Sequence, residues 1–287
     1  MRPLPLLSLA LVFALSACAT TAVPRLATVA PPGEQRFDAV WHGPGFGLGS
    51  ATLVSPEGEE RDVWANSASL IQTDMRSAFF SLAAWDVYGA TGVAPRWEAG
   101  AALSPWRVGG TLRTQLSDLY RAPVNLALGL ELGYRILPGY TGPVGKIQLD
   151  ASRPVPWGHL FSNLAFSYEA RARVLDLGLT TTLNPEHPRR ADRSEYRFRR
   201  DEIGAGLVVG AMWQPTQIER VTLTAVERGP TSYQFSVALA ADLLLASTRS
   251  APLCRRCFDY EVRDPRTYGA MTLLLGVHLR PRSYLWR

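Results

Sequence analysis

The sequence predicts an all-β protein, an antiparallel up-and-down transmembrane β-barrel of about 10–12 strands. Three observations predict it. From about residue 76 onward, apolar and polar residues alternate with a period of two in one segment after another, and no amphipathic helix competes with them. The polar parity is rich in glycine and alanine beside charges of both signs, which suits a narrow lumen better than a strand facing water. Aromatic residues lie near strand ends on the apolar parity, as in the interfacial girdles of membrane barrels.

The segment VNLALGLELGYRI, residues 124–136, shows the pattern most clearly. Its even-numbered residues are apolar, whereas Glu131 and Arg135 lie on the odd parity. The same rhythm predicts further strands within residues 96–103, 107–117, 146–151, 162–174, 202–213, 232–245 and 268–280. Alternation alone also fits a soluble lipocalin-like barrel or a β-sandwich, with the apolar parity as a core. The composition of the polar parity and the aromatic positions favour the transmembrane barrel.

The alternating pattern also predicts which aromatic residues form the girdles and where one strand is interrupted. The predicted girdle residues are Trp97, Tyr134, Tyr168, Trp213, Tyr233, Phe235 and Tyr268. The parity reverses at Val174 and Leu175, which predicts a bulge or a tight turn there.

The first residues have the features of a secretory signal. Arg2 is followed by an apolar stretch to Leu15 and by small residues before Cys18. The run Leu15-Ser16-Ala17-Cys18 resembles the lipobox of bacterial lipoproteins, and this resemblance implies cleavage before Cys18 and acylation of that cysteine, palmitate included. Ala19 in place of aspartate favours the outer membrane by the sorting rule of such lipoproteins. An ordinary signal peptide that ends near a cysteine is the alternative.

The domain organisation follows from these patterns. Residues 1–17 form the signal peptide, and residues 18–35 are expected to be the lipidated cysteine and a flexible tether, because the stretch has prolines and no apolar periodicity. Residues 36–75 are expected to be a first hairpin or a plug, and residues 76–287 the barrel.

Residues 86–134 resemble the small outer-membrane β-barrel proteins of bacteria, which show a W/L-E-x-G strand followed by glycine-alternating strands. The matching residues are Trp97, Glu98 and Gly100. The resemblance implies a cell outer membrane location. The chain departs from the pattern at its end, RPRSYLWR, where Trp286 is penultimate and no aromatic residue is last.

The charge of the chain limits which partners are expected. The chain has 287 residues, 30 Lys and Arg, 25 Asp and Glu, and a formal net charge of +5, with Lys146 as its single lysine. So many arginines favour outer-membrane lipids or lipopolysaccharide as partners, besides an envelope protein, or they reflect codon usage. Residues 184–202 form an arginine-rich loop on this interpretation, either an anion-binding surface or a neutralised, solvated loop. Nucleic acid is not an expected partner of an exported chain.

Charged residues on the polar parity predict a network inside the lumen. Its members are Arg107, Arg113, Glu131, Arg135, Lys146, Asp150, Glu169, Arg171, Arg173 and His278. Cross-strand ion pairs among them are expected to fill a small barrel and to leave a structural, interaction or narrow-channel role. If the lumen conducts, its excess of arginine predicts a preference for anions.

The remaining chemistry is sparse. Cys254 and Cys257 are expected to form a loop disulfide, with redox activity or half of a zinc site as alternatives, and no cofactor or metal is expected. His278 could approach Ser236 and Asp242 if the last strands are neighbours. Because no G-x-S-x-G elbow accompanies these residues, the sequence predicts that the protein is not an enzyme. An outer-membrane lipid hydrolase and a lipid-tethered soluble β-barrel that binds a hydrophobic ligand are the alternatives.

Overall fold

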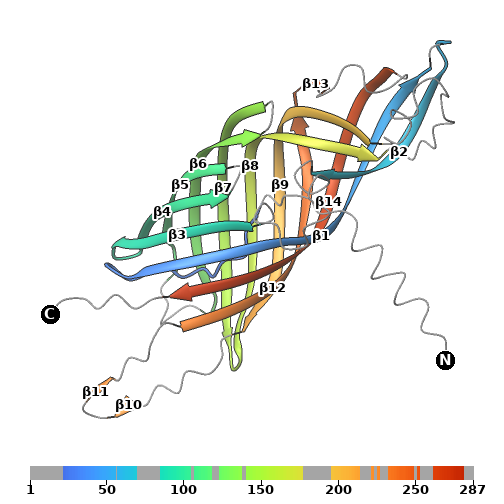
Figure 1. Ribbon diagram of the computed structural model, residues 1–287. Helices are drawn as coiled ribbons and strands as arrows, with labels where there is room; N and C mark the ends of the chain where they lie inside the picture. Colours follow the sequence, from blue (N-terminus) through green and yellow to red (C-terminus); the bar gives the residue numbers. More distant parts are fainter. Residues whose placement is uncertain are drawn as a thin grey trace, which may run out of the picture.

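The alternating segments form long strands in the computed structural model, and ten of these strands close into an antiparallel barrel (Figure 1). The structure describes residues 22–55, 57–69, 85–104, 107–117, 123–137, 140–176, 195–213, 221–222, 225–226, 232–248, 251–252 and 261–280. The barrel strands are β1 (Gln35–Val54), β3 (Trp85–Ala94), β4 (Trp97–Ser104), β5 (Arg107–Gln115), β6 (Asn125–Leu137), β7 (Tyr140–Val155), β8 (Gly158–Asp176), β9 (Glu195–Trp213), β12 (Ser232–Ser247) and β14 (Glu261–Arg280). The count agrees with the prediction from the sequence.

Four shorter strands accompany the barrel. They are β2 (Glu60–Ser69), β10 (Val221–Thr222), β11 (Ala225–Val226) and β13 (Ala251–Pro252). β2 forms a hairpin with the second half of β1 and then pairs with the last residues of β8. β10 pairs with β11, and β13 with β9.

The barrel closes between its first and last strands. β14 pairs with β1 along most of its length, with Asp38 opposite His278. On its other side the first part of β1 pairs with β3, from Gln35 opposite Thr91 to Trp41 opposite Trp85. We call the end at which β1 begins and β14 finishes the terminal end, and the opposite end the loop end. β8 and β12 finish at the loop end.

The apolar parity faces outward. Leu128, Leu130 and Leu132 of β6 are exposed by 39%, 41% and 61%, whereas Glu131 between them is 2% exposed. Membrane-spanning barrels have large apolar side chains on the outer surface and charged side chains in the interior. The soluble alternative, in which these leucines form a core, is therefore wrong. All seven predicted girdle residues are exposed as well, by 37–55%.

Several strands are longer than the membrane requires. β1 and β14 have 20 residues each, whereas a strand of about 9–11 residues crosses the hydrocarbon layer. Figure 1 shows β1, β2 and β14 projecting together beyond the body of the barrel at the loop end. In this projecting part the inward face is apolar, with a buried cluster of Ala51, Leu53, Ala65, Leu175, Tyr196 and Phe198.

This apolar inner cluster corrects two predictions. β8 continues without a register shift against β9 through residues 174 and 175, so the predicted bulge or turn there is wrong. The parity reverses because the inward side changes from polar to apolar, and Leu175 is fully buried. Residues 195–202, predicted as part of a loop, form the start of β9, and its inward residues include Phe198 and Glu202.

Candidate functional site: the lumen

The N-terminal segment of the described chain lies inside the barrel. Ala22, Val23, Leu26 and Ala27 are at most 3% exposed. Ala22, Val23 and Leu26 belong to a buried apolar cluster that includes Val40 and other residues of the barrel wall. We call residues 22–30 the plug. The sequence assigned these residues to a flexible tether. For residues 36–75 it predicted a first hairpin or a plug, and residues 35–54 and 60–69 form β1 and β2, which pair as a hairpin.

The plug is held through its backbone. Alternate amides donate hydrogen bonds to side chains of the barrel wall: Val23 to Gln148 Oε1 at 3.0 Å, Arg25 to Asn163 Oδ1 at 3.3 Å, Ala27 to Ser152 Oγ at 3.1 Å and Val29 to Gln115 Oε1 at 3.4 Å. A buried backbone amide needs a partner, and here the lumen side chains take the place of a neighbouring strand.

The carbonyl groups of the plug are bound in the same way. Gln148 and Asn163 each return a hydrogen bond to the carbonyl of the residue whose amide they accept. Arg36 donates to the Thr28 carbonyl at 3.0 Å. The plug is therefore an integral part of the barrel interior.

A first group of ion pairs lies beside the plug, toward the terminal end. The Arg113 guanidinium contacts Glu98 at 2.6 Å, pairs with Asp150, and donates to the Leu26 carbonyl at 2.7 Å. Glu98 also accepts the Ala30 amide at 2.8 Å and pairs with Arg36 at 3.1 Å. Arg113 and its carboxylate partners are at most 2% exposed. One arginine thus neutralises two buried carboxylates and binds the plug.

A second group is centred on Tyr88, on the inner face of β3. Arg107 donates to the Tyr88 hydroxyl at 2.6 Å and pairs with Asp86 at 3.1 Å. The Arg25 guanidinium of the plug lies 4.0 Å from the Tyr88 ring centroid, within cation–π range. His42 lies 3.2 Å from Asp86.

The same group extends across the lumen through Glu131. This carboxylate pairs with Lys146 at 2.6 Å and with Arg107 at 3.3 Å. Both cations also lie within 5.7 Å of the Tyr88 ring centroid. The single lysine of the chain is therefore an internal residue.

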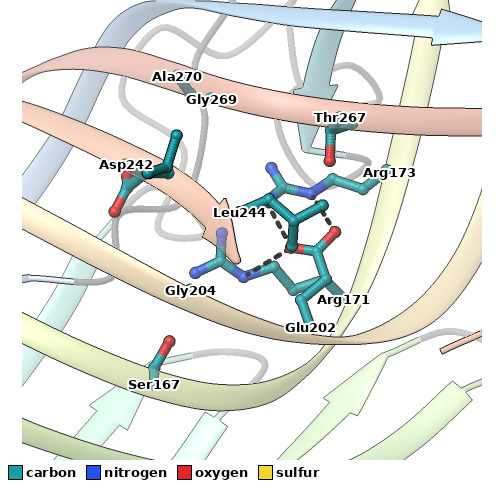
Figure 2. A pocket seen from close by; sticks show the side chains of 11 residues that line it. Ser167, Arg171, Arg173, Glu202, Gly204, Asp242, Leu244, Thr267, Gly269 and Ala270 are labelled. Atoms are coloured by element: carbon teal, nitrogen blue, oxygen red, sulfur yellow. Dashed lines mark hydrogen bonds and ion pairs between the residues drawn. The ribbon is translucent and has the colours of Figure 1, made fainter. Parts of the chain in front are cut away.

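A third group, which we call the upper layer, lies nearer the loop end. Glu169 pairs with Arg135 at 2.6 Å and with Arg171. Glu202 pairs with Arg173 at 2.7 Å and with Arg200 at 2.8 Å. Figure 2 shows Arg171 and Arg173 of β8 converging on Glu202 of the neighbouring strand β9.

The space beside the upper layer is small. A cavity of about 20 Å³, lined by Ser167, Asp242 and Thr267 among others, adjoins Arg171 and Glu202. This volume holds about one water molecule. The space between these side chains of the upper layer is therefore only water-sized.

The lumen carries an excess of positive charge. Among the described residues, the buried cations are Arg25, Arg36, Arg107, Arg113, Arg135, Lys146, Arg171, Arg173 and Arg200. The buried carboxylates are Asp38, Glu98, Glu131, Asp150, Glu169 and Glu202. Each of these carboxylates contacts at least one of the cations, as buried charges require.

His278 lies beside the first group, because its partner Asp38 also pairs with Arg36 at 3.3 Å. Its ring contacts Ser236 of β12 and Asp38 of β1, at 2.8 Å and 2.9 Å. The approach to Ser236 agrees with the sequence-based expectation, whereas Asp242 lines the small cavity shown in Figure 2. The acid beside His278 is Asp38, because closure of the barrel places β1 next to β14.

The structure therefore places all ten predicted lumen residues inside the barrel, where each is at most 8% exposed. It distributes them among three ion-pair groups and the His278 contact. Several side chains that take part in these lumen contacts were not predicted from the sequence. They are Asp38, His42, Asp86, Tyr88, Glu98, Arg200 and Glu202. Glu98 could have been predicted, since it lies on the polar parity, between Trp97 and Ala99 of the apolar parity.

Some predicted sites fall outside the described residues. These are Cys18, Cys254, Cys257 and the arginines of residues 184–194. Within the described ranges, no group of three or more His, Cys, Asp or Glu side chains could hold a metal ion. In the same ranges, no helix is long and apolar enough to cross a membrane.

Comparison with known proteins gives a likeness of fold. No family model and no curated protein matches the sequence. Among solved structures, the outer membrane protease OmpT from Escherichia coli is similar, with 10% identity, a TM-score of 0.38, and coverage of 89% of this chain and 99% of that chain. The prediction from the sequence that the chain is not an enzyme is corrected here, since the similar barrel OmpT is a protease. At this identity and TM-score the likeness carries no argument about the activity of the present chain.

Three features agree with one another: the strand order is closed, the apolar side chains face outward, and the interior is charged. This chain has the fold of an outer-membrane β-barrel.

Proposed function

We propose that the protein is an outer-membrane barrel that is held shut at rest by its own N-terminal plug, and that it has a structural or interaction role in the envelope. The observation that carries this proposal is the binding of the plug: four alternate amides of residues 23–29 are bonded to lumen side chains. An open pore would need these groups to face water.

The upper layer supplies a second, independent closure. Its ion pairs join β6, β8 and β9, and Arg200 continues the layer to the Pro265 carbonyl and the Thr267 hydroxyl of β14. None of these contacts involves the plug. Removal of either closure alone therefore leaves the other one in place.

Planar-bilayer recording tests this arrangement with two alterations. The first replaces residues 23–29 by glycine and serine, and the second combines Arg171→Ala with Glu202→Ala. We expect the native protein and each altered form to show no steady conductance, and the form that carries both alterations to conduct. The open lumen should prefer anions, because its buried cations still outnumber its carboxylates.

Two results would contradict the proposal. One is a steady conductance of the native protein. The other is silence of the combined variant when heat-modifiable gel mobility shows that it is folded. Arg263→Ala, on the exposed part of β14, is the matched control and should behave as the native protein.

Lipid attachment at Cys18 is the second part of the proposal. Three residues separate Cys18 from Ala22, so the four residue-to-residue steps span at most about 14 Å even when fully extended. A lipid on Cys18 would therefore hold the plug close to the membrane, which a long free tether would not do.

Metabolic labelling with a palmitate analogue, followed by membrane fractionation, tests the attachment. The native protein should incorporate the label. Cys18→Ala should lose the label but remain in the outer membrane after alkaline extraction, because the barrel itself spans the bilayer. An unlabelled native protein would mean that the chain has an ordinary signal peptide.

Anionic lipid headgroups, lipopolysaccharide phosphates among them, are the partner that we propose for Arg266, on the outer rim of the barrel at the loop end. A cavity of about 270 Å³ there is lined by Trp64, Tyr268 and Arg266, together with Asp62 and Asp264. Trp64 is 68% exposed, and its ring centroid lies 5.5 Å from that of Tyr268. An aromatic pair beside an arginine suits the boundary between acyl chains and phosphate groups.

Binding of purified lipopolysaccharide to the detergent-solubilised protein tests this contact. Arg266→Ala should weaken binding and reduce its dependence on salt concentration. Arg61→Ala, on the neighbouring strand β2, is the control. Equal binding by the native protein and Arg266→Ala would show that this cavity does not bind lipopolysaccharide. An envelope protein would then be the partner to test.

A further inference from the structure

Three polar side chains meet on the lumen wall where the barrel closes. Ser236 lies on β12, His278 on β14 and Asp38 on β1, three neighbouring strands. Ser236 Oγ is 2.8 Å from His278 Nε2, and Asp38 Oδ1 is 2.9 Å from His278 Nδ1. The three residues are 3%, 2% and 5% exposed.

The hydrogen bonds determine which ring nitrogen carries the proton. A carboxylate only accepts hydrogen bonds, so Nδ1 of His278 donates to Asp38. In a neutral imidazole Nε2 is then an acceptor, and the Ser236 hydroxyl donates to it. This is the tautomer in which a histidine acts as a general base toward a serine.

Gly276 makes the contact between Ser236 and His278 feasible. It pairs with Ser236 across the two strands. A Cβ atom at this position would lie 2.3 Å from Ser236 Oγ and 2.7 Å from His278 Nε2. The absence of a side chain is therefore needed for the two groups to meet.

The surroundings of Ser236 are apolar on the side toward the middle of the barrel. Met212 of β9 and Leu274 of β14 lie on the two strands that flank β12, Ala238 lies on β12 itself, and Val40 lies on β1; all four belong to one buried cluster. On the other side, β12 begins only four residues earlier, at Ser232. Ser236 therefore lies on the terminal-end side of the upper layer.

We propose that Ser236 is a nucleophile, with His278 as its general base and Asp38 as the residue that positions the imidazole, and that the site hydrolyses carboxylic esters with an apolar acyl group. The apolar neighbours accommodate the acyl chain. This activity is additional to the closed-barrel role and does not depend on it.

The reaction is balanced with water as the co-reactant. Ser236 Oγ attacks the ester carbonyl carbon while its proton passes to His278 Nε2, and Asp38 stabilises the resulting imidazolium. The carbon–oxygen bond to the alcohol breaks, and the alcohol leaves with the proton from Nε2. Water then attacks the acyl-serine by the same proton transfers, which releases the carboxylic acid and restores Ser236.

Covalent labelling of the full-length, folded protein tests the proposal. The protein in detergent micelles is treated with diisopropyl fluorophosphate, a small serine-directed reagent, and the modified peptide is identified by mass spectrometry. Hydrolysis of p-nitrophenyl butyrate is measured in parallel. We expect an adduct on Ser236, and ester hydrolysis that falls about a hundredfold or more in Ser236→Ala and in Asp38→Asn.

Ser167→Ala is the matched control, since Ser167 is another inward serine of the wall and is 6% exposed. It should retain both labelling and hydrolysis. Heat-modifiable mobility establishes that each variant is folded, and Asp38→Asn provides a second, nearly isosteric change if Ser236→Ala does not fold.

The proposal is overturned if the folded native protein forms no adduct on Ser236. It is equally overturned if hydrolysis is undiminished in Ser236→Ala, or if Asp38→Asn reacts as fast as the native protein. In each of these cases the three side chains would serve only to join β12, β14 and β1. The conductance of the barrel is a separate measurement, so the closed-barrel proposal stands or falls independently.

Discussion

At the scale of single residues, the lumen depends on side chains that satisfy several partners at once. Arg113 is the clearest example, because it pairs with Glu98 and Asp150 and also binds the Leu26 carbonyl of the plug. Loss of one member of a buried ion group leaves its partners charged and uncompensated, which costs more than the intact group contributes.

Arg113→Met should therefore lower the free energy of unfolding by about 3–5 kcal/mol, since it leaves two buried carboxylates without their shared cation. Urea unfolding of the barrel in lipid vesicles, followed by tryptophan fluorescence, measures the change. Arg263→Ala is the control, because its ion pairs lie on the exposed rim, and it should leave the unfolding midpoint unchanged. A decrease below about 1 kcal/mol for Arg113→Met would show that water reaches these carboxylates.

At the scale of elements, the plug depends on its turn at the terminal end. Gly33 donates to the Gly92 carbonyl at 2.9 Å, and Gly92 donates to the Glu34 carbonyl at 2.9 Å. Gly33 has a φ of 79°, in the left-handed region that glycine tolerates. A Cβ atom at Gly92 would lie 2.0 Å from the Pro31 carbonyl oxygen. The chain therefore enters the lumen only because β3 has no side chain at this point.

Gly92→Val should displace the plug without opening the barrel wall. In a protein whose natural cysteines are replaced, Val23→Cys reports the plug through its reaction with a maleimide. We expect its rate to rise about tenfold or more when Gly92→Val is added, because local opening controls access to a buried group. Gly110→Val is the control, since a Cβ atom there meets nothing within 4 Å. Unchanged reactivity would indicate that the lumen contacts alone hold the plug.

At the scale of the whole molecule, the barrel separates two environments. The outward residues form an apolar band bounded by aromatic side chains, with Tyr134 and Tyr168 toward the loop end and Trp97 and Trp213 toward the terminal end. The inward residues hold paired charges. Beyond the band, the projecting part of β1, β2 and β14 has an apolar interior of its own.

Leu239 lies in the middle of the outward face of β12 and is 56% exposed. Leu239→Arg should destabilise the folded barrel in a bilayer by about 2–4 kcal/mol, because a charge would face the hydrocarbon layer. Trp64→Arg, on the projecting hairpin, should have little effect on insertion. Refolding yield and urea unfolding in vesicles measure both variants. Equal stability of Leu239→Arg and the native protein would contradict a lipid-facing position.

The amino-acid sequence by itself determined the strands, the even-numbered barrel and the inward parity of the charged residues. These are local properties, since a two-residue period places alternate side chains on opposite faces whatever the partner strand. Once the apolar parity is outward, Arg113, Glu131 and Asp150 must lie in the lumen. Glycine on the same parity indicated how narrow that lumen is.

The tertiary structure alone decided how the lumen is filled. The plug has no periodicity because its backbone makes the contacts, and Val23 and Arg25 find partners 125 and 138 residues away. The acid beside His278 depended on the register of β1 against β14, which places Asp38 opposite His278. Closure of a barrel brings the two ends of the chain together, and no local pattern encodes the residue at which they meet.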